Sequence, residues 1–172
     1  VSTIVGQSDG KIVIGGAFTG LAPTVANVNA TELTTRNHIA RLNADGGVDA
    51  AYNPNANGNV LAAALQSDGK LVIGGTFTTL QPNADTVFTL RKYAARLNTD
   101  GSVDTAFNLD LNELSSNRVD SIRIQSDGRV LLGGNFLTLH PAGTAARLTR
   151  RNFVRLVAGA NAVDTTFDPN TG

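Results

Sequence analysis

The tetrapeptide Gln-Ser-Asp-Gly occurs three times in this chain of 172 residues, beginning at Gln7, Gln66 and Gln125. Both intervals between successive tetrapeptides are 59 residues. A fixed internal period is the signature of a repeat architecture, in which each copy is one supersecondary unit that stacks on its neighbours. The period therefore predicts one continuous repeat domain with three copies. The predicted copies are residues 1–59, 60–118 and 119–172.

A wider frame recurs around each tetrapeptide. A basic residue, three apolar residues, Gly-Gly and a Phe follow it, and each copy later closes on Val-Asp and an aromatic residue. The aromatic residues of this frame are Phe18, Phe77, Phe136, Tyr52, Phe107 and Phe167. Their fixed places among apolar strands favour packing between neighbouring copies over a sugar-stacking surface.

Two segments of the repeat change length while the period stays fixed. The distance from the Gln to the Arg of the later Arg-Leu pair is 34 residues in the first copy and 30 in the others. The distance from the closing aromatic residue to the next Gln changes by the same number of residues in the opposite direction, which restores the period. The segments 20–35, 79–90 and 137–149 also differ in sequence. Because surface loops tolerate such changes, we expect these segments to be loops and to carry any ligand contacts.

The middle copy predicts four β-strands, over residues 60–66, 70–77, 93–98 and 102–107. Ser-Asp-Gly and Thr-Asp-Gly turns, ending at Gly69 and Gly101, join these strands into two hairpins. No stretch has a sustained 3.6-residue apolar period, so we expect almost no helix. The expected fold is all-β, with three four-stranded antiparallel blades of a β-propeller-like array that forms part of a larger propeller.

Two motifs together resemble the delta-sixty repeat, a bacterial and archaeal repeat of β-propeller type. They are Gln-Ser-Asp-Gly-Lys followed by three apolar residues and Gly-Gly-x-Phe, and Ala-Arg-Leu-Asn-x-Asp-Gly-x-Val-Asp-x-x-Phe. The resemblance covers essentially the whole chain, although the third copy has a different second turn at 157–161. It implies a large secreted or cell-surface protein, often with adhesion or sugar-binding modules elsewhere, and brings no catalytic motif with it.

Composition excludes several classes of function. The 14 basic residues balance the 14 acidic ones, which argues against a general affinity for nucleic acid or anionic membrane. No apolar run approaches the ~18 residues of a membrane span. The absence of Cys excludes disulfides, Cys-ligated zinc and thiol catalysis. Many Thr, Asn, Gly and Ala residues with little Lys resemble the composition of bacterial secreted or surface proteins.

The two ends of the chain lie in register with the repeat. Val1 corresponds to Val60, and residues 168–172 resemble 53–58 at the end of the first copy. We therefore expect an excerpt of a longer array, whose terminal copies show no polar capping unit. The open sheet edges of three blades would require further repeats or subunits of the same array as partners.

Repeated polar residues are interpreted first as structural. Asp and Gly are the residues that a tight turn requires, and the turn positions are Asp9, Gly10, Asp68, Gly69, Asp127 and Gly128. The expected structural ion pairs are Arg41 with Asp49, Arg96 with Asp104, and Arg155 with Asp164. Each of these arginines follows another by five residues, at Arg36, Arg91 and Arg150. A repeated anion or glycan contact is the alternative role for these arginines.

Two turns also resemble fragments of a calcium loop, with oxygen ligands at alternate positions and a Gly for the bend. Their side chains are Asn43, Asp45, Asp49, Asn98, Asp100 and Asp104. Each turn supplies three side chains, whereas calcium takes about six to eight oxygens, so this is a weak candidate. His38 and His140 are not equivalent in the repeat, and neither lies beside a nucleophile or a second ligand at a recognisable spacing. We therefore expect no cofactor and no catalytic residue.

These observations favour a structural and interaction module at the cell surface, such as an adhesin, stalk or filament scaffold. The alternative is a carbohydrate-binding propeller that recognises polysaccharide through the long loops. A polysaccharide-acting enzyme ranks last, because paired carboxylates occur only at the shared turn positions.

Overall fold

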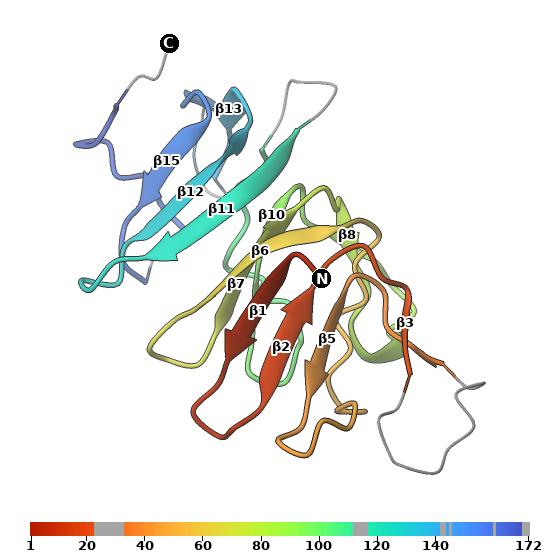
Figure 1. The fold of residues 1–172 in the computed structure, drawn as a ribbon. Helices are drawn as coiled ribbons and strands as arrows, with labels where there is room; N and C mark the ends of the chain where they lie inside the picture. The colour runs from red at the N-terminus through yellow and green to blue at the C-terminus, as the bar shows by residue number, and fades with distance from the viewer. Residues whose placement is uncertain (23–32, 112–116, 142–143, 145, 160, 170–172) are drawn as a thin grey trace.

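The computed structural model describes residues 1–22, 33–111, 117–141, 144, 146–159 and 161–169. Within these residues the regular elements are β-strands and one short 3-10 turn, η1 (Pro82–Ala84), which confirms the all-β prediction. The strands form small antiparallel sheets, one set in each copy of the repeat (Figure 1).

Each copy contains a three-stranded antiparallel sheet with its second strand at the centre. The sheets are β1 (Thr3–Gly6), β2 (Ile12–Gly15) and β5 (Ile39–Leu42); β6 (Val60–Leu65), β7 (Leu71–Gly75) and β10 (Ala94–Leu97); and β11 (Arg118–Ile124), β12 (Val130–Asn135) and β15 (Phe153–Leu156). The first two strands of each sheet are joined by the Ser-Asp-Gly turn. Its glycine has a φ of 81–82° in all three copies, a conformation that side chains other than Gly rarely adopt.

The structure does not show the four-stranded blade that the sequence predicts. In place of a fourth strand over 102–107, the second copy has an isolated bridge between Leu97 and Val103. The other copies have equivalent bridges, Leu42–Val48 and Leu156–Val163. The strand stops because the next residue turns the chain. Asp104 Oδ1 accepts a hydrogen bond from Ala106 N at 3.0 Å, and side-chain bonds of this kind compete with a β-ladder.

The variable segments begin and end in short paired strands. The ladders are β3 (Gly20–Leu21) with β4 (Thr34–Thr35), β8 (Thr79–Leu80) with β9 (Thr89–Leu90), and β13 (Thr138–Leu139) with β14 (Leu148–Thr149). The prediction of plain loops is therefore wrong at the ends of these segments. Residues 23–32 of the first segment and 142, 143 and 145 of the third lie outside the described residues.

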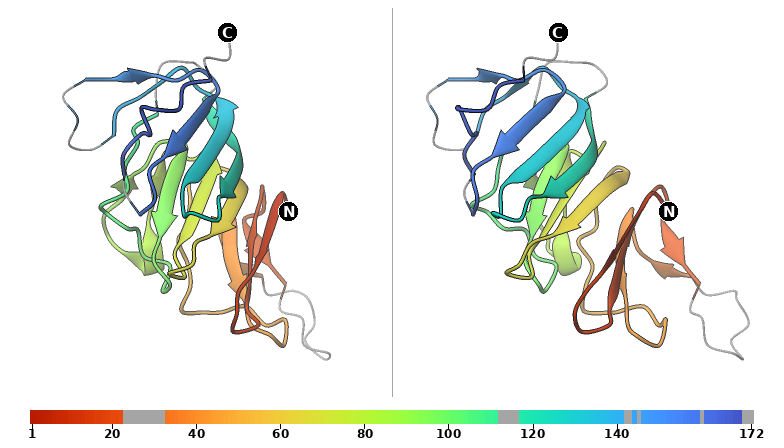
Figure 2. Two further views of the ribbon diagram at one scale, coloured as in Figure 1. Left: turned by 90° about the vertical axis from the view of Figure 1, so that its left-hand side faces the viewer. Right: turned by 60° about the vertical axis from the view of Figure 1, so that its left-hand side comes forward.

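The three sheets follow one another face to face along the chain (Figures 1 and 2). The first strand of each later copy lies on the sheet before it, with β6 against β1 and β2, and β11 against β6 and β7. Two apolar clusters form the core, and each spans one junction between copies. At each junction a buried valine covers a glycine of the preceding copy, Val60 over Gly15 and Val119 over Gly74.

Candidate functional site

An ion cluster recurs beside the closing turn of each copy. In the first copy, Arg41 Nε donates a hydrogen bond to Asp49 Oδ2 at 2.9 Å, and Lys11 Nζ lies 2.8 Å from the same oxygen. The counterparts are Arg96, Lys70 and Asp104 in the second copy and Arg155, Arg129 and Asp164 in the third. The corresponding distances are 2.9 and 2.7 Å in the second copy, and 3.0 and 3.4 Å in the third.

The same arginine also lies against the closing aromatic residue, and in the first copy it reaches the second copy as well. The guanidinium carbon of Arg41 lies 4.2 Å from the ring centroid of Tyr52, and the equivalent distances in the later copies are 5.2 and 4.1 Å. Arg41 Nη1 donates to Thr99 O of the second copy at 2.7 Å. The cluster therefore fastens each copy internally and also joins the first copy to the second.

The electrostatics of this cluster favour an ionised carboxylate. Burial raises the pKa of Asp49, but the hydrogen bonds from Lys11 and Arg41 together outweigh burial, so the pKa lies below its usual range. Asp104 has the same balance, with burial opposed by its bonds to Lys70, Ala106 and Arg96. Both carboxylates are thus held charged at neutral pH by cations of their own copy.

The arginine five residues earlier binds backbone carbonyls. Arg36 donates to Thr35 O at 2.8 Å and to Asp49 O at 3.2 Å, and Arg91 donates to Leu90 O at 2.7 Å. Burial lowers the pKa of both arginines. Each has less than a tenth of its surface exposed, so a ligand in solution reaches little of either guanidinium.

The turn residues serve the backbone. The turn aspartates Asp9, Asp68 and Asp127 each accept a hydrogen bond from the backbone N–H two residues later, at 3.0–3.1 Å. The acidic calcium candidates are engaged in the same way or by cations. Asp45 and Asp100 accept from the N–H two residues on, while the cluster cations hold Asp49 and Asp104. In the described part of the chain, no three acidic, His or Cys side chains converge as a metal site requires.

The two histidines lie in different surroundings. His38 Nδ1 lies 3.2 Å from Gly16 O, and its φ is 63°. The counterparts of His38, Tyr93 and Asn152, have φ values of 65° and 62°, so this bend belongs to the scaffold of the repeat. His140 Nε2 lies 3.0 Å from Thr144 O. Each of these ring nitrogens therefore contacts a backbone carbonyl and not a nucleophilic side chain.

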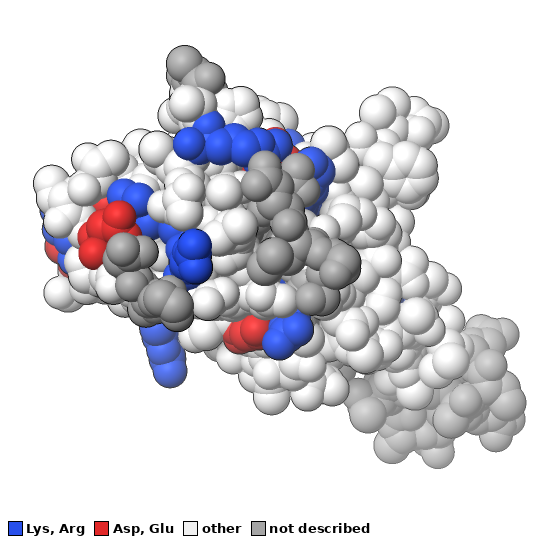
Figure 3. Space-filling model, turned by 90° about the horizontal axis from the view of Figure 1, so that it is seen from above, with Lys and Arg blue, Asp and Glu red and all other residues white. Residues whose placement is uncertain are grey.

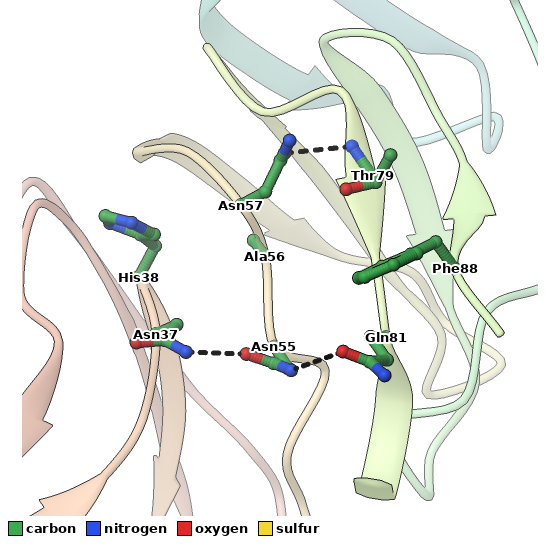
Figure 4. Close-up of a pocket in the computed structure, with 8 residues that line it drawn as sticks. All are labelled: Asn37, His38, Asn55, Ala56, Asn57, Thr79, Gln81 and Phe88. Atoms are coloured by element: carbon green, nitrogen blue, oxygen red, sulfur yellow. Dashed lines mark hydrogen bonds between the residues drawn. The ribbon is translucent and has the colours of Figure 1, made fainter. Parts of the chain in front are cut away.

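A cavity of about 360 Å³ lies at the first junction (Figure 4). Its lining residues are Asn37, His38, Asn55, Ala56, Asn57, Thr79, Gln81 and Phe88. Asn37 Nδ2 donates to Asn55 Oδ1 at 2.7 Å, and Asn57 Oδ1 accepts from Thr79 N at 2.9 Å. Figure 4 shows Phe88 on one side, His38 and Asn37 on the other, and the segment of Asn55 and Asn57 between them. Phe88 is 64 % exposed.

The equivalent positions at the second junction are charged. Asn37 and Asn55 correspond to Lys92 and Asp110, and Lys92 Nζ lies 2.8 Å from Asp110 Oδ1. Phe88 corresponds to Arg147, whose Nη2 lies 3.6 Å from Asp110 Oδ2. The repeat therefore keeps its ion clusters and changes the side chains at this place between copies. The first junction offers amides and an aromatic ring, and the second offers opposite charges.

A protein-family model matches a large part of the chain. The model of the family described as "Domain of unknown function (DUF5122) beta-propeller" matches residues 7–28, 30–52 and 66–107, just over half of the chain. The chain belongs to the DUF5122 β-propeller family. This membership supports the predicted repeat of propeller type, and the matched residues of the DUF5122 repeat lie in the first two copies. No curated protein matches the chain.

One face of the DUF5122 repeats is mixed in charge. On the face drawn in Figure 3, basic side chains lie in small groups, some beside acidic ones, separated by uncharged surface. No helix in the described residues is long and apolar enough to cross a membrane.

Sequence analysis missed part of the lining of the first-junction cavity. Asn37, Asn55 and Asn57 lie outside the variable segments in which ligand contacts were expected, whereas Gln81 and Phe88 lie within one of them. A signal exists in the alignment of the copies. Within the repeated frame, a few positions carry amides in one copy and charged residues in the next. These positions lie together at the junction between two copies, where the cavity is.

Proposed function

We propose that this chain is a non-enzymatic structural and interaction module of the delta-sixty type, which holds variable side chains on a repeated scaffold. The observation that carries the proposal is the contrast between two sets of positions. The ion clusters and the glycine–valine contacts recur from copy to copy, whereas the cavity-lining side chains change from amides to charges. In such a scaffold the backbone geometry stays constant, and the side chains offered to a partner can vary from copy to copy.

We place the module in an extracellular or cell-surface protein, as part of an adhesin, stalk or filament. The three copies are successive blades, and further repeats complete a closed propeller, which takes about four to eight blades. The cysteine-free composition, with 18 Gly and few Lys residues, supports a surface protein, as does the resemblance to the delta-sixty repeat. Immunolabelling of intact cells that make the full protein tests the location: label only after permeabilisation would contradict it.

The scaffold role is tested by replacing the variable segment 81–88, between β8 and β9, with a Gly/Ser linker of equal length. The Asp104 cluster and the Gly74 contact lie outside this segment, so we expect the circular dichroism spectrum and a cooperative urea transition to remain. A partner bound through that loop should be lost. Loss of the fold would show that the segment belongs to the core, and would refute its role as a display loop.

Carbohydrate binding is a second candidate, favoured by the lining of the first-junction cavity. Its eight residues carry amides, a hydroxyl, an imidazole and an exposed aromatic ring, and none is Asp, Glu, Lys or Arg. Such a lining suits an uncharged ligand with hydroxyl groups and an apolar face. A glycan array should give hits that Phe88→Ala removes and that Val87→Ala, an exposed neighbour outside the cavity, retains. Hits that survive Phe88→Ala would place binding elsewhere.

A further inference from the structure

The side-chain amides of the first-junction cavity form a hydrogen-bonded relay with a single direction. Asp85 O can only accept, so Gln81 Nε2 donates to it and Gln81 Oε1 is turned towards Asn55. Asn55 Nδ2 donates to this oxygen at 3.5 Å, and Asn55 Oδ1 accepts from Asn37 Nδ2 at 2.7 Å (Figure 4). One backbone carbonyl of the second copy therefore fixes the orientation of all three amides.

His38, on the first-copy wall of the cavity, is also oriented by a backbone carbonyl. Gly16 O lies 3.2 Å from His38 Nδ1 and can only accept, so Nδ1 carries the proton of the neutral ring. Nε2 is then left as an acceptor, because a neutral imidazole has one N–H. Asn37 Oδ1 is a second acceptor on this wall, and neither atom accepts a hydrogen bond from the described residues.

The relay also leaves donors without a partner. A side-chain amide has two N–H groups, and the relay uses one from Asn55 and one from Gln81, so each of these residues keeps a second donor. A ligand that completes the cavity must donate to the first-copy wall and accept from these amides. A trans secondary amide does both, because its N–H and C=O point in opposite directions from one planar group. A hydroxyl carries its donor and its acceptors on one oxygen, so it spans less of the relay.

The rest of the lining selects an uncharged ligand of about one sugar ring. None of the eight lining residues is Asp, Glu, Lys or Arg, so a charged group would enter without a partner. The volume of about 360 Å³ is near the lower end of the ~300–1,000 Å³ of ligand pockets. Phe88 lies across the cavity from His38, and its exposed ring offers an apolar surface for the C–H groups of a pyranose (Figure 4).

We propose that the first-junction cavity binds an N-acetylhexosamine residue of a glycan. The acetamido N–H donates to Asn37 Oδ1 or His38 Nε2. The acetamido oxygen accepts from Asn55 or Gln81, and the sugar ring packs on Phe88. The inference rests on carbohydrate binding, the second candidate function, and adds the class of sugar that the cavity selects.

Two trisaccharides that differ only at the acetamido group test this assignment: β-1,4-linked N-acetylglucosamine and β-1,4-linked glucose. In an NMR titration of the isotope-labelled chain, the first should shift the side-chain N–H signals of Asn55 and Gln81 and saturate at one site per chain. The acetamido group spans donor and acceptor where the hydroxyl of glucose satisfies one of them. The N-acetylglucosamine trimer should therefore bind at least about tenfold more tightly.

The double substitution Asn37→Lys with Asn55→Asp is the matched variant, because it transfers to the first junction the pair that the second junction already holds. Lys92 Nζ lies 2.8 Å from Asp110 Oδ1 on the same scaffold, so circular dichroism should show the fold retained. The relay is interrupted, and the affinity for the N-acetylglucosamine trimer should fall at least about tenfold. Val87→Ala, at an exposed position outside the cavity, should leave the affinity unchanged.

The outcomes separate the class of sugar from carbohydrate binding itself. Equal affinities for the two trimers, or a higher affinity for the glucose trimer, would overturn the acetamido assignment and leave carbohydrate binding standing. Binding of neither trimer would overturn both. Binding that survives the double substitution would place the sugar elsewhere and refute the assignment. A blocked diglycine peptide that shifts the same signals more strongly would assign the cavity to peptides instead. The scaffold role is tested separately by the loop replacement.

Discussion

Replacing Gly74 with alanine tests whether the copies are locked by the glycine–valine contact. The added Cβ would lie 2.5 Å from Val119 Cγ1 and 2.8 Å from Val119 Cβ, far inside van der Waals contact. Val119 is fully buried, so it has little room to withdraw. Overpacking of this kind costs about 1–3 kcal/mol. Alanine also restricts the unfolded chain, which returns about 0.5 kcal/mol, so we expect a net loss of about 1.5 kcal/mol.

Gly133→Ala is the matched control, because it makes the same chemical change at the same position of the third copy. Its Cβ would meet nothing closer than 3.8 Å, which is ordinary contact. Only the effect on the unfolded chain remains, and we expect a gain of about 0.4–1 kcal/mol in the free energy of unfolding. The two variants should therefore differ by about 2–3 kcal/mol, combining these two expectations.

Urea unfolding at a concentration where the chain is monomeric measures the difference. With a slope of about 2 kcal/mol per M, the midpoints of the two variants should lie about 1 M or more apart, with Gly74→Ala the lower. Midpoints that move together, in either direction, would refute the claim that the following copy closes over Gly74.

Three further outcomes follow from the described contacts. Asp104→Asn should lower the free energy of unfolding by about 2 kcal/mol. This is less than the ~3–5 kcal/mol lost when one partner of a fully buried ion pair is removed, because Lys70 reaches solvent. An unchanged urea midpoint would contradict this. Phe77→Ala should cost about 3–5 kcal/mol, whereas the exposed Phe88→Ala should stay within about 0.5 kcal/mol; equal losses would show that the core is misplaced. Folding lowers the pKa of Asp49 and Asp104, so the folded state binds fewer protons than the unfolded state below pH ~4. The free energy of unfolding should therefore hold above the usual pKa of about 3.8 and fall as the pH drops through the lowered pKa values. Equal urea midpoints at pH ~3 and pH ~7 would contradict this.

The hairpins could be predicted from the sequence because their determinants are local. A Ser-Asp-Gly turn between apolar runs needs a residue that accepts positive φ, and Gly69 has a φ of 82° between β6 and β7. The fourth strand could not be predicted in the same way. Val103 and Asp104 alternate as a strand would, but the Asp104 side chain bonds to Ala106 N and ends the pairing after one bridge.

The cavity is harder to predict because its residues come together only when two copies pack. Asn37 and Asn55 belong to the first copy and Gln81 to the second, and no one of these residues is unusual in its own segment. The arginine–aspartate clusters lie at the other extreme. Arg41 and Asp49 are eight residues apart on the two sides of one turn, so their contact depends on a single hairpin.

The most direct test of the repeated architecture is a set of distances between equivalent turns. Ser8, Ser67 and Ser126 are exposed at the same place in the three hairpins, and the chain has no cysteine to interfere with labels placed there in pairs. Double electron–electron resonance should give the same distance for 8–67 and 67–126, since both junctions pack alike. The 8–126 distance should be shorter than their sum, because blades of a propeller turn about a common axis. Unequal neighbouring distances, or an 8–126 distance equal to that sum, would contradict the account.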